Sequence, residues 1–193
     1  MTSPDDKQWE YAVEALRRSH DVVVFTGAGM SAESGIATFR DDDGFWRRFP
    51  PKEFAKWSGL IKTATTNPRR FGEFLLAILE PIADAEPNAG HRAIADLEQH
   101  VNVTIVTQNI DGLHQAAGST VVKEIHGSLF ETMDLRTNRF RDLVSRDEVK
   151  QVVENVRRAM TGFLPAPRLM MAVQPLFGVD LQGGHRPNLV LFG

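Results

Sequence analysis

Three short polar segments, each directly after a run rich in β-branched residues, hold the side chains of this sequence that could do chemistry. The runs are DVVVFT (21–26), NVTIVT (102–107) and TVVKEI (120–125), and each is typical of a buried strand. The polar segments begin at Gly27, Gln108 and His126. Because open α/β sheets bind ligands at the carboxyl ends of their strands, the pattern predicts one site shared by the three segments.

The first polar segment, Gly27-Ala28-Gly29-Met30-Ser31, could hold a phosphate. Its glycines let the backbone approach a diphosphate, and the helix that follows offers unpaired N–H groups. A tight turn without a ligand would use the same two glycines. The segment departs from the dinucleotide fingerprint G-x-G-x-x-G, since Ala32 stands at the third glycine. A second strand ending in an acidic residue about 20 positions later is also missing, which disfavours a conventional hydride-transfer dehydrogenase.

The second and third segments carry an amide, a carboxylate and an imidazole. Asn109 and Asp111 are two residues apart, so on an extended backbone their side chains point the same way. Together they could hold a ribose, an amide or a water. His126 follows the third run, and a histidine can act as a general base at neutral pH. A histidine at a strand end could equally hydrogen-bond to the backbone and take no part in catalysis.

Helices and strands alternate around these segments. The spacing of apolar residues predicts four helices, over residues 7–19, 67–80, 87–99 and 145–159. Asn67 before a proline predicts the start of the second helix, and Ser145 with Glu148 forms a capping box before the fourth. A fourth strand is expected at 188–193. The alternation predicts an α/β fold with a mostly parallel sheet. Residues 127–187, with helices but no convincing strand, are interpreted as an inserted subdomain.

The composition narrows the classes of function. A formal net charge of -3 gives no electrostatic footprint for nucleic acid or for a membrane surface. The sequence has no cysteine, which excludes a disulfide framework, thiolate catalysis and cysteine-ligated zinc. No apolar run approaches the roughly 20 residues that span a bilayer, and the acidic start is unlike a signal peptide. We therefore expect a soluble cytoplasmic protein.

Several segments in order resemble the sirtuins, the NAD-dependent protein deacylases. GAGMSAESGIATFR (27–40) is similar to their cofactor-binding loop, and TQNIDGLH (107–114) and HGS (126–128) are similar to two further blocks. PNAGH (87–91) and RPNLVLFG (186–193) resemble two more landmarks of the family. The resemblance implies a Rossmann-like fold that binds NAD, and it extends over most of the chain after residue 20.

The resemblance also implies a reaction. The acyl group of a modified lysine in a protein substrate passes to ADP-ribose derived from NAD, and nicotinamide is released. His126 is then the general base, acting through a ribose hydroxyl, while Asn109 and Asp111 shape the nicotinamide pocket. The other implied cofactor-binding residues are Gly27, Ala28, Gly29 and Ser31 around the diphosphate, Gln108 at the ribose, Ile110 beside the carboxamide, Phe39 over the reactive sugar carbon and Arg40 on the phosphate side.

The acyl preference is predicted from one helix. Sirtuins that remove acidic acyl groups carry a Tyr-x-x-Arg pair on the helix before the Pro-Asn block. Residues 71–80 hold neither tyrosine nor arginine. A neutral acyl group such as acetyl is therefore expected.

The sequence departs from the sirtuin pattern at the zinc site. Sirtuins usually carry two cysteine pairs in a small subdomain after the His-Gly block. These positions fall at Asp134, Thr137, Val179 and Gln182. One carboxylate without cysteine or histidine does not make a zinc site. We expect residues 127–187 to form a metal-free, mainly helical subdomain in which apolar packing replaces the zinc ribbon.

A second departure is that the chain ends at Gly193. In sirtuins this strand leads into a helix and loops that hold the adenosine half of NAD. We find four expected strands where the dinucleotide fold ordinarily has six. The expectation is a C-terminally incomplete NAD-binding domain of residues 1–126 and 188–193, with the segment 30–80 inside it. Either the sequence is a fragment of a longer gene product, which we favour, or another chain supplies the missing half.

Two other functions stay open on the sequence. The same scaffold could transfer ADP-ribose to a side chain or to water, as a mono-ADP-ribosyltransferase or an NAD hydrolase. The chain could also be a catalytically inactive NAD-binding fragment. Asn109, Asp111 and His126 are intact and favour the deacylase.

Overall fold

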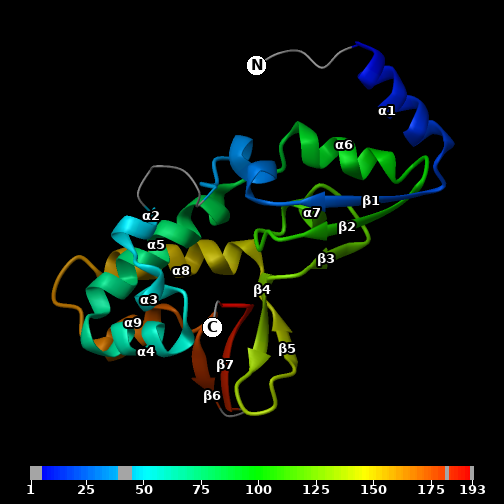
Figure 1. Ribbon diagram of the computed structural model, residues 1–193. Coiled ribbons are helices and arrows are strands. Elements are labelled where there is room, and N and C mark those ends of the chain that lie inside the picture. Colours follow the sequence, from blue (N-terminus) through cyan, green and yellow to red (C-terminus); the bar gives the residue numbers. More distant parts are fainter. Residues whose placement is uncertain (1–5, 39–44, 181–182, 192–193) are drawn as a thin grey trace.

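A parallel three-stranded sheet forms one part of the molecule. The computed structural model describes residues 6–38, 45–180 and 183–191 (Figure 1). Strands β1 (Asp21–Thr26), β2 (Asn102–Thr107) and β3 (Val122–Glu124) pair in parallel in the order β1-β2-β3. Thr26 lies beside Thr107, and Thr107 beside Glu124, so the three strands end at one level. The predicted α/β fold with a parallel sheet is confirmed.

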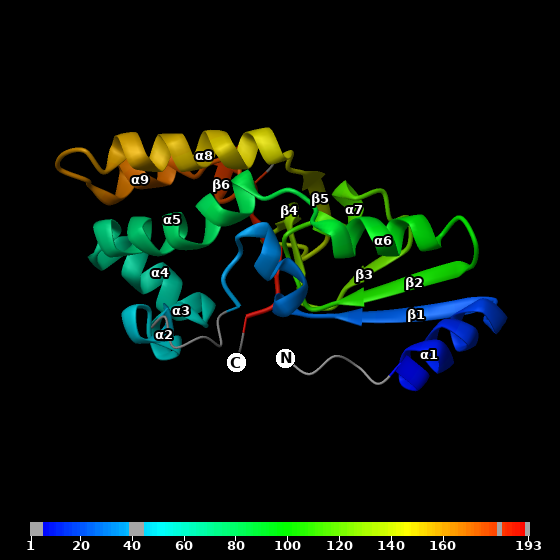
Figure 2. The same cartoon turned by 90° about the horizontal axis from the view of Figure 1, so that it is seen from above.

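Three helices accompany this sheet (Figures 1 and 2): α1 (Asp6–Arg18), α6 (Ala89–Leu97) and α7 (Leu113–Ala116). The predicted helices over 7–19 and 87–99 are therefore present. The side chain of Asn88 accepts hydrogen bonds from the backbone N–H groups of Gly90 and His91, which satisfies the first turn of α6. In the described parts of the chain, no helix combines the length and the apolar character needed to cross a membrane.

A helical layer joins segments that are far apart in the sequence. It contains α2 (Phe45–Arg48), α3 (Pro51–Phe54), α4 (Trp57–Thr66), α5 (Pro68–Asp84), α8 (Arg146–Ala159) and α9 (Ala166–Ala172). Helix α5 packs against α8 and α9 (Figure 2). The apolar stripe of α8 is fully used, since Val149, Val152, Val153 and Val156 are all buried in the core. Apolar burial of this kind is the main stabilisation of the layer.

The predicted starts of α5 and α8 are confirmed. The Asn67 side chain accepts a hydrogen bond of 3.2 Å from the backbone N–H of Arg70. Ser145 and Glu148 form the expected capping box, in which each side chain accepts from the backbone N–H of the other residue. These local signals act within four residues, which explains why the sequence alone was enough to place them.

A second, antiparallel sheet corrects the expected subdomain. Strands β4 (Gly127–Asp134), β5 (Phe140–Leu143), β6 (Gly178–Asp180) and β7 (Gly183–Leu189) lie in the order β5-β4-β7-β6. The prediction of a mainly helical subdomain without a strand over residues 127–187 is therefore wrong. The fourth strand expected at 188–193 is wrong as well, because β7 ends at Leu189 and pairs with β4 instead of joining the parallel sheet.

The error has a physical reason. Parallel strands are buried on both faces and show continuous apolar runs, whereas an antiparallel sheet can leave one face in water and carry charged residues there. Strands β5 and β7 contain arginine or histidine and, in β7, a proline, so they lack the signal that identified β1 and β2. The proposed division of the chain into domains stays a prediction.

Candidate functional site

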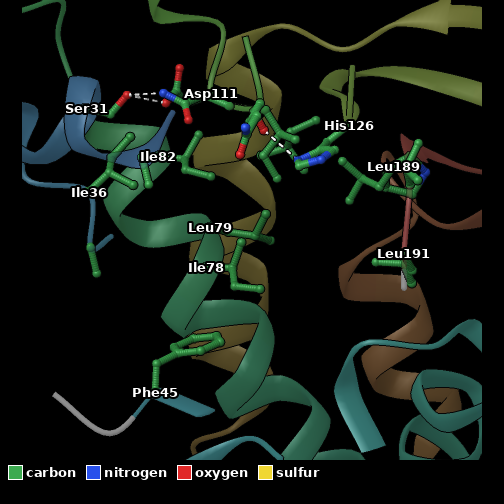
Figure 3. Close-up of a pocket in the computed structure, with 18 of the residues that line it drawn as sticks. Ser31, Ile36, Phe45, Ile78, Leu79, Ile82, Asp111, His126, Leu189 and Leu191 are labelled. Atoms are coloured by element: carbon green, nitrogen blue, oxygen red, sulfur yellow. Dashed lines mark hydrogen bonds between the residues drawn. The ribbon is translucent and has the colours of Figure 1, made fainter. Parts of the chain in front are cut away.

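The loops that follow β1, β2 and β3 line one cavity of about 1140 Å³. Nine of the predicted site residues are in its wall: Gly27, Ala28, Gly29, Ser31, Gln108, Asn109, Ile110, Asp111 and His126. Phe39 and Arg40 lie outside the described residues. The parallel register brings the three polar segments together because it ends the three strands at one level. Figure 3 shows Ser31 and Asp111 at one end of the cavity and Phe45 at the other.

Ser31 is the centre of a hydrogen-bond network in this wall (Figure 3). It belongs to the 3-10 helix η1 (Ala28–Ser34), and its hydroxyl donates to Oδ2 of Asp111 at 2.6 Å. The Nδ2 group of Asn109 donates to the same Ser31 oxygen and to the carbonyl oxygen of Gly27, both at 3.0 Å. Asn109 and Asp111, two residues apart in the loop after β2, therefore contact the same side chain. The network joins the loop after β1 to the loop after β2.

The buried carboxylate of Asp111 is held on both oxygens. Its Oδ1 accepts from the backbone N–H of Leu113 at 3.0 Å, while Oδ2 accepts from Ser31. A buried carboxylate needs such partners, because burying a charged group without hydrogen bonds lowers the free energy of unfolding by roughly several kcal/mol. The predicted contact of Ser31 with a diphosphate stays a prediction, and in this structure the Ser31 hydroxyl is engaged with Asp111.

Asn88 supports the same network from α6. Its Nδ2 group donates to the carbonyl oxygen of Met30 at 2.8 Å and to Oγ of Ser34 at 3.1 Å. The helix cap of α6 thus also holds η1 in place. Asn88 belonged to a segment that matches the family but was not predicted as a site residue. The signal that could have identified Asn88 is its position at the N-cap of a predicted helix within a segment that resembles the family.

Two buried histidines lie behind the network. The rings of His91 and His114 meet with centroids 4.8 Å apart. The hydroxyl of Thr26 donates to Thr107, so it accepts from Nε2 of His114 at 3.0 Å. Burial lowers the pKa of both histidines, and Asp111 only partly opposes this effect. Both imidazoles are therefore neutral at pH 7 and act as packed, hydrogen-bonded supports of the strand ends.

His126 is the imidazole that reaches the cavity. Its Nδ1 lies 3.0 Å from the carbonyl oxygen of Gln108 (Figure 3). A carbonyl oxygen only accepts, so the proton of the neutral ring is on Nδ1 and the basic nitrogen is Nε2. The backbone contact that the sequence offered as an alternative to catalysis is present, and it fixes the tautomer that a general base needs.

The other end of the cavity is apolar. Helix α5 contributes six apolar side chains to the cavity wall, and aromatic residues of other segments also line it: Phe71, Phe74, Leu75, Ile78, Leu79 and Ile82 from α5, with Phe54, Trp57 and Phe177. Leu75 and Ile78, three residues apart on α5, both line the cavity. The cavity therefore has a polar end at the parallel sheet and an apolar end in the helical layer.

Glu124 lies at the end of β3, two residues before His126, beside a depression of about 290 Å³ that Glu131 also lines. Burial, and then the charge of Glu131, raise the pKa of Glu124 to about 7. The folded protein therefore binds this proton more tightly than the unfolded chain, whose reference value is 4.5. Stability is fully present below the unfolded value and falls as the pH rises through the interval to about 7.

Glu124→Gln is expected to raise the free energy of unfolding at pH 8, on the order of 1 kcal/mol after allowance for solvent screening. The gain should shrink as the pH falls towards 4.5, the reference value of the unfolded carboxyl. Urea titrations at pH 4.5, 6 and 8 measure this difference. Glu10→Gln, on the exposed face of α1, is the control for the loss of any carboxylate. Equal pH profiles for Glu124→Gln and the parent would contradict the assignment.

The residues at the sirtuin zinc positions do not fit a zinc ion. Oδ1 of Asp134 accepts from the N–H of Arg136 at 3.0 Å and from the N–H and Oγ1 of Thr137 at 2.6 and 2.8 Å. These hydrogen bonds lower the pKa of Asp134 and close the turn between β4 and β5. Valine at 179 has no ligand atom, and Gln182 lies outside the described residues. No group of three metal-ligating side chains occurs in the described ranges.

We expect the purified protein to contain no stoichiometric zinc and to keep its melting temperature when a strong zinc chelator is added. The reason is that hydrogen bonds of Asp134 close the first turn and the buried valines of α8 supply apolar packing. Elemental analysis and a thermal melt with and without chelator measure both. Zinc at one equivalent, or a melting temperature lowered by the chelator, would overturn this expectation.

Comparison with known proteins agrees with this geometry. A model of the Sir2 family matches residues 27–193. An NAD-dependent protein deacylase of Desulfosudis oleivorans is 39% identical over 184 residues, which is 94% of this chain and 66% of the relative. NAD-dependent protein deacylase 2 of Archaeoglobus fulgidus is 52% identical over 119 residues, which is 61% of this chain and 45% of the relative.

Solved structures show the same similarity. A Sir2 homolog–NAD complex superposes with a TM-score of 0.67 at 31% identity, covering 100% of this chain and 63% of the other. A Sir2 homologue mutant with 2'-O-acetyl ADP-ribose has a TM-score of 0.66 at 33% identity, covering 95% of this chain and 64% of the other. The chain thus spans about half to two thirds of the length of these relatives. Because the family model matches residues 27–193 in one continuous range, the chain belongs to the Sir2 family.

Proposed function

We propose that this chain binds NAD in the cavity and catalyses NAD-dependent removal of a neutral acyl group from lysine side chains of proteins. The observation that carries the proposal is the polar wall in which Ser31, Asn109 and Asp111 form one network beside His126. Relatives named NAD-dependent protein deacylases and a Sir2 homolog–NAD complex support the choice of cofactor and reaction. A cytoplasmic location stays a prediction from the sequence.

The proposed roles are those that the resemblance to sirtuins implies, and the contacts in the cavity wall support them. NAD supplies the nicotinamide–ribose bond that the reaction breaks. Asn109 and Asp111 form the nicotinamide side of the site, where the Ser31 hydroxyl keeps their side chains in place. Nε2 of His126 takes up the proton of a ribose hydroxyl, since Nδ1 is held by the Gln108 carbonyl. Ala28 and Gly29 present backbone to the diphosphate, because neither carries a side chain beyond Cβ.

The acyl-lysine is proposed to enter from the helical layer. Leu75 and Ile78 occupy the wall of the cavity on α5, and no arginine lies between residues 71 and 80. An acidic acyl group would lose its hydration there without gaining a cation, whereas a neutral group loses little. The proposed substrates are therefore proteins with acetyl-lysine or another neutral acyl-lysine.

The test is peptide-dependent release of nicotinamide. The chain is incubated with NAD and an acetyl-lysine peptide, and nicotinamide, deacetylated peptide and free ADP-ribose are measured together. Equal amounts of nicotinamide and deacetylated peptide are expected. Free ADP-ribose released without peptide would identify an NAD hydrolase instead. Binding of NAD in a calorimetric titration without any turnover would identify the inactive NAD-binding alternative.

A further inference from the structure

Arg146 carries a positive charge at a position where its own helix does not stabilise one. It is the first residue of α8, after the Ser145 cap, where the helix dipole disfavours positive charge. The guanidinium is half-buried, and burial lowers the pKa of Arg146. Both the helix dipole and burial disfavour the charged guanidinium, so other contacts must compensate. The partners of Arg146 that do so lie outside α8.

The guanidinium of Arg146 joins three elements. Nη2 donates to the backbone carbonyl oxygen of Asp111 at 2.9 Å, and Nη1 donates to the carbonyl oxygen of Ile82 near the end of α5. The guanidinium carbon lies 4.8 Å from the centre of the Phe130 ring on β4. One side chain of α8 thus contacts the loop after β2, helix α5 and strand β4.

The turn that Arg146 holds leaves no room for a larger residue. Gly112 adopts φ +65°, and a Cβ built there would lie 2.9 Å from the Phe130 ring and 3.9 Å from Nη2 of Arg146. Phe130 and Arg146 therefore close on the Asp111–Gly112 turn from one side. Ser31 holds the Asp111 carboxylate from the other side.

Three carbonyl oxygens of the loop after β2 are held by three different residues outside it. Gln108 O lies 3.0 Å from Nδ1 of His126, Ile110 O accepts from the N–H of Leu129 at 3.2 Å, and Asp111 O accepts from Arg146. Only the contact from Arg146, among these three, is made to Asp111, whose carboxylate accepts from Ser31. A shift of the backbone at this turn would carry the Asp111 side chain with it and would also move the Leu113 N–H that binds Oδ1.

We propose that Arg146 is a positioning residue of the active site, which fixes the Asp111–Gly112 turn and thereby aims Asp111 and Asn109 at Ser31 and the cavity. Through it, the helical layer and the polar end of the cavity are coupled, since a shift of α8 relative to the loop after β2 breaks this contact. The catalytic consequence rests on the proposed function. The effect on the loop does not, because it concerns the order of the backbone alone.

Amide hydrogen exchange tests the effect on the loop without any activity. Arg146→Met keeps an unbranched apolar stem at this position but removes the guanidinium, and with it the hydrogen-bond donors and the charge. Amide exchange in residues 109–113 is expected to become at least tenfold faster than in the parent. This includes the Leu113 amide, whose N–H donates to Oδ1 of Asp111. The matched control is Val156→Ala, a buried residue on the same helix away from this cavity.

Both variants are compared at the same interval below their melting temperatures. Equal exchange of residues 109–113 in Arg146→Met and Val156→Ala would overturn the proposal, because only general destabilisation would then remain. Arg146→Lys, which keeps the charge and a donor, is expected to give intermediate exchange and covers the case in which Arg146→Met does not fold. Exchange in Arg146→Lys as slow as in the parent would leave only charge as the cause and also overturn the positioning geometry.

Steady-state kinetics tests the catalytic part. Arg146→Met is expected to lower kcat/KM for NAD at least tenfold and to leave KM for the acetyl-lysine peptide within twofold, with partial recovery in Arg146→Lys. Val156→Ala is expected to leave both parameters near the parent values. An equal loss in Arg146→Met and Val156→Ala would contradict positioning. A parent chain without turnover would refute the proposed function, and the exchange experiment would still decide the role of Arg146.

Discussion

Replacing His126 with alanine is expected to lower the turnover of NAD and acetyl-lysine peptide about 100- to 10,000-fold, the usual contribution of a general base. The Gln108 carbonyl holds Nδ1, so the ring presents Nε2 as its basic nitrogen, and alanine removes this group without filling the cavity. NAD affinity should stay within a few-fold of the parent, because the Ser31–Asn109–Asp111 network does not include His126. Nicotinamide release and a calorimetric titration measure the two quantities.

His100→Ala is the matched control for this prediction. His100 is an exposed histidine after α6, and it is not part of the cavity wall. Its replacement should leave turnover unchanged. Added imidazole should restore part of the activity of His126→Ala, since a small base can occupy the vacated space. A His126→Ala variant as active as the parent would remove the general base from the proposed mechanism.

Replacing Gly127 with alanine is expected to lower the free energy of unfolding by about 3 kcal/mol, from a left-handed backbone at roughly 1–2 kcal/mol and steric overlap at roughly 1–3 kcal/mol. Gly127 has φ +80°, and a Cβ there would lie 1.9 Å from the carbonyl oxygen of Asn188. The overlap falls where β4 pairs with β7, one residue after His126. Urea unfolding measures the loss, and turnover should fall with it.

Gly162→Ala provides the control for Gly127. Gly162 has no heavy atom within 4 Å of a built Cβ and lies in an exposed turn after α8. Its replacement should change the free energy of unfolding by less than about 0.5 kcal/mol, as at an ordinary surface position. If Gly127→Ala lowered the free energy of unfolding as little as Gly162→Ala, the pairing of β4 with β7 would tolerate a shift at Gly127 and the prediction would be wrong.

The polar end of the site could be predicted in outline. The runs before Gly27, Gln108 and His126 are rich in β-branched residues, and parallel pairing then places their ends side by side. The expectation that all three strands are buried is wrong for β1, because Val23 and Phe25 are 70% and 63% exposed. The spacing of Asn109 and Asp111 indicated that both side chains serve one place, and both contact Ser31. The individual roles of these residues, and those of Phe39 and Arg40, stay predictions.

The partners within the site could not be predicted. Nothing local to Ser31 indicates that its hydroxyl binds a carboxylate 80 positions later, and nothing local to Arg146 indicates that it reaches Asp111 and Ile82. The same holds for Leu75 and Ile78, whose apolar spacing predicts a buried helix face but not a cavity wall. Each of these contacts depends on how separate elements pack.

The sequence by itself determined the features that depend on neighbouring residues. These are the helix caps at Asn67 and Ser145, the parallel strands β1 and β2, and the polar segments that follow them. Only the tertiary structure decided that β4 to β7 form an antiparallel sheet, that α5 packs on α8, and that Arg146 reaches the loop after β2. The caps are stabilised within a few residues and the strands are recognisable from their own β-branched runs, whereas these contacts join segments far apart in the chain and exist only once the elements have packed.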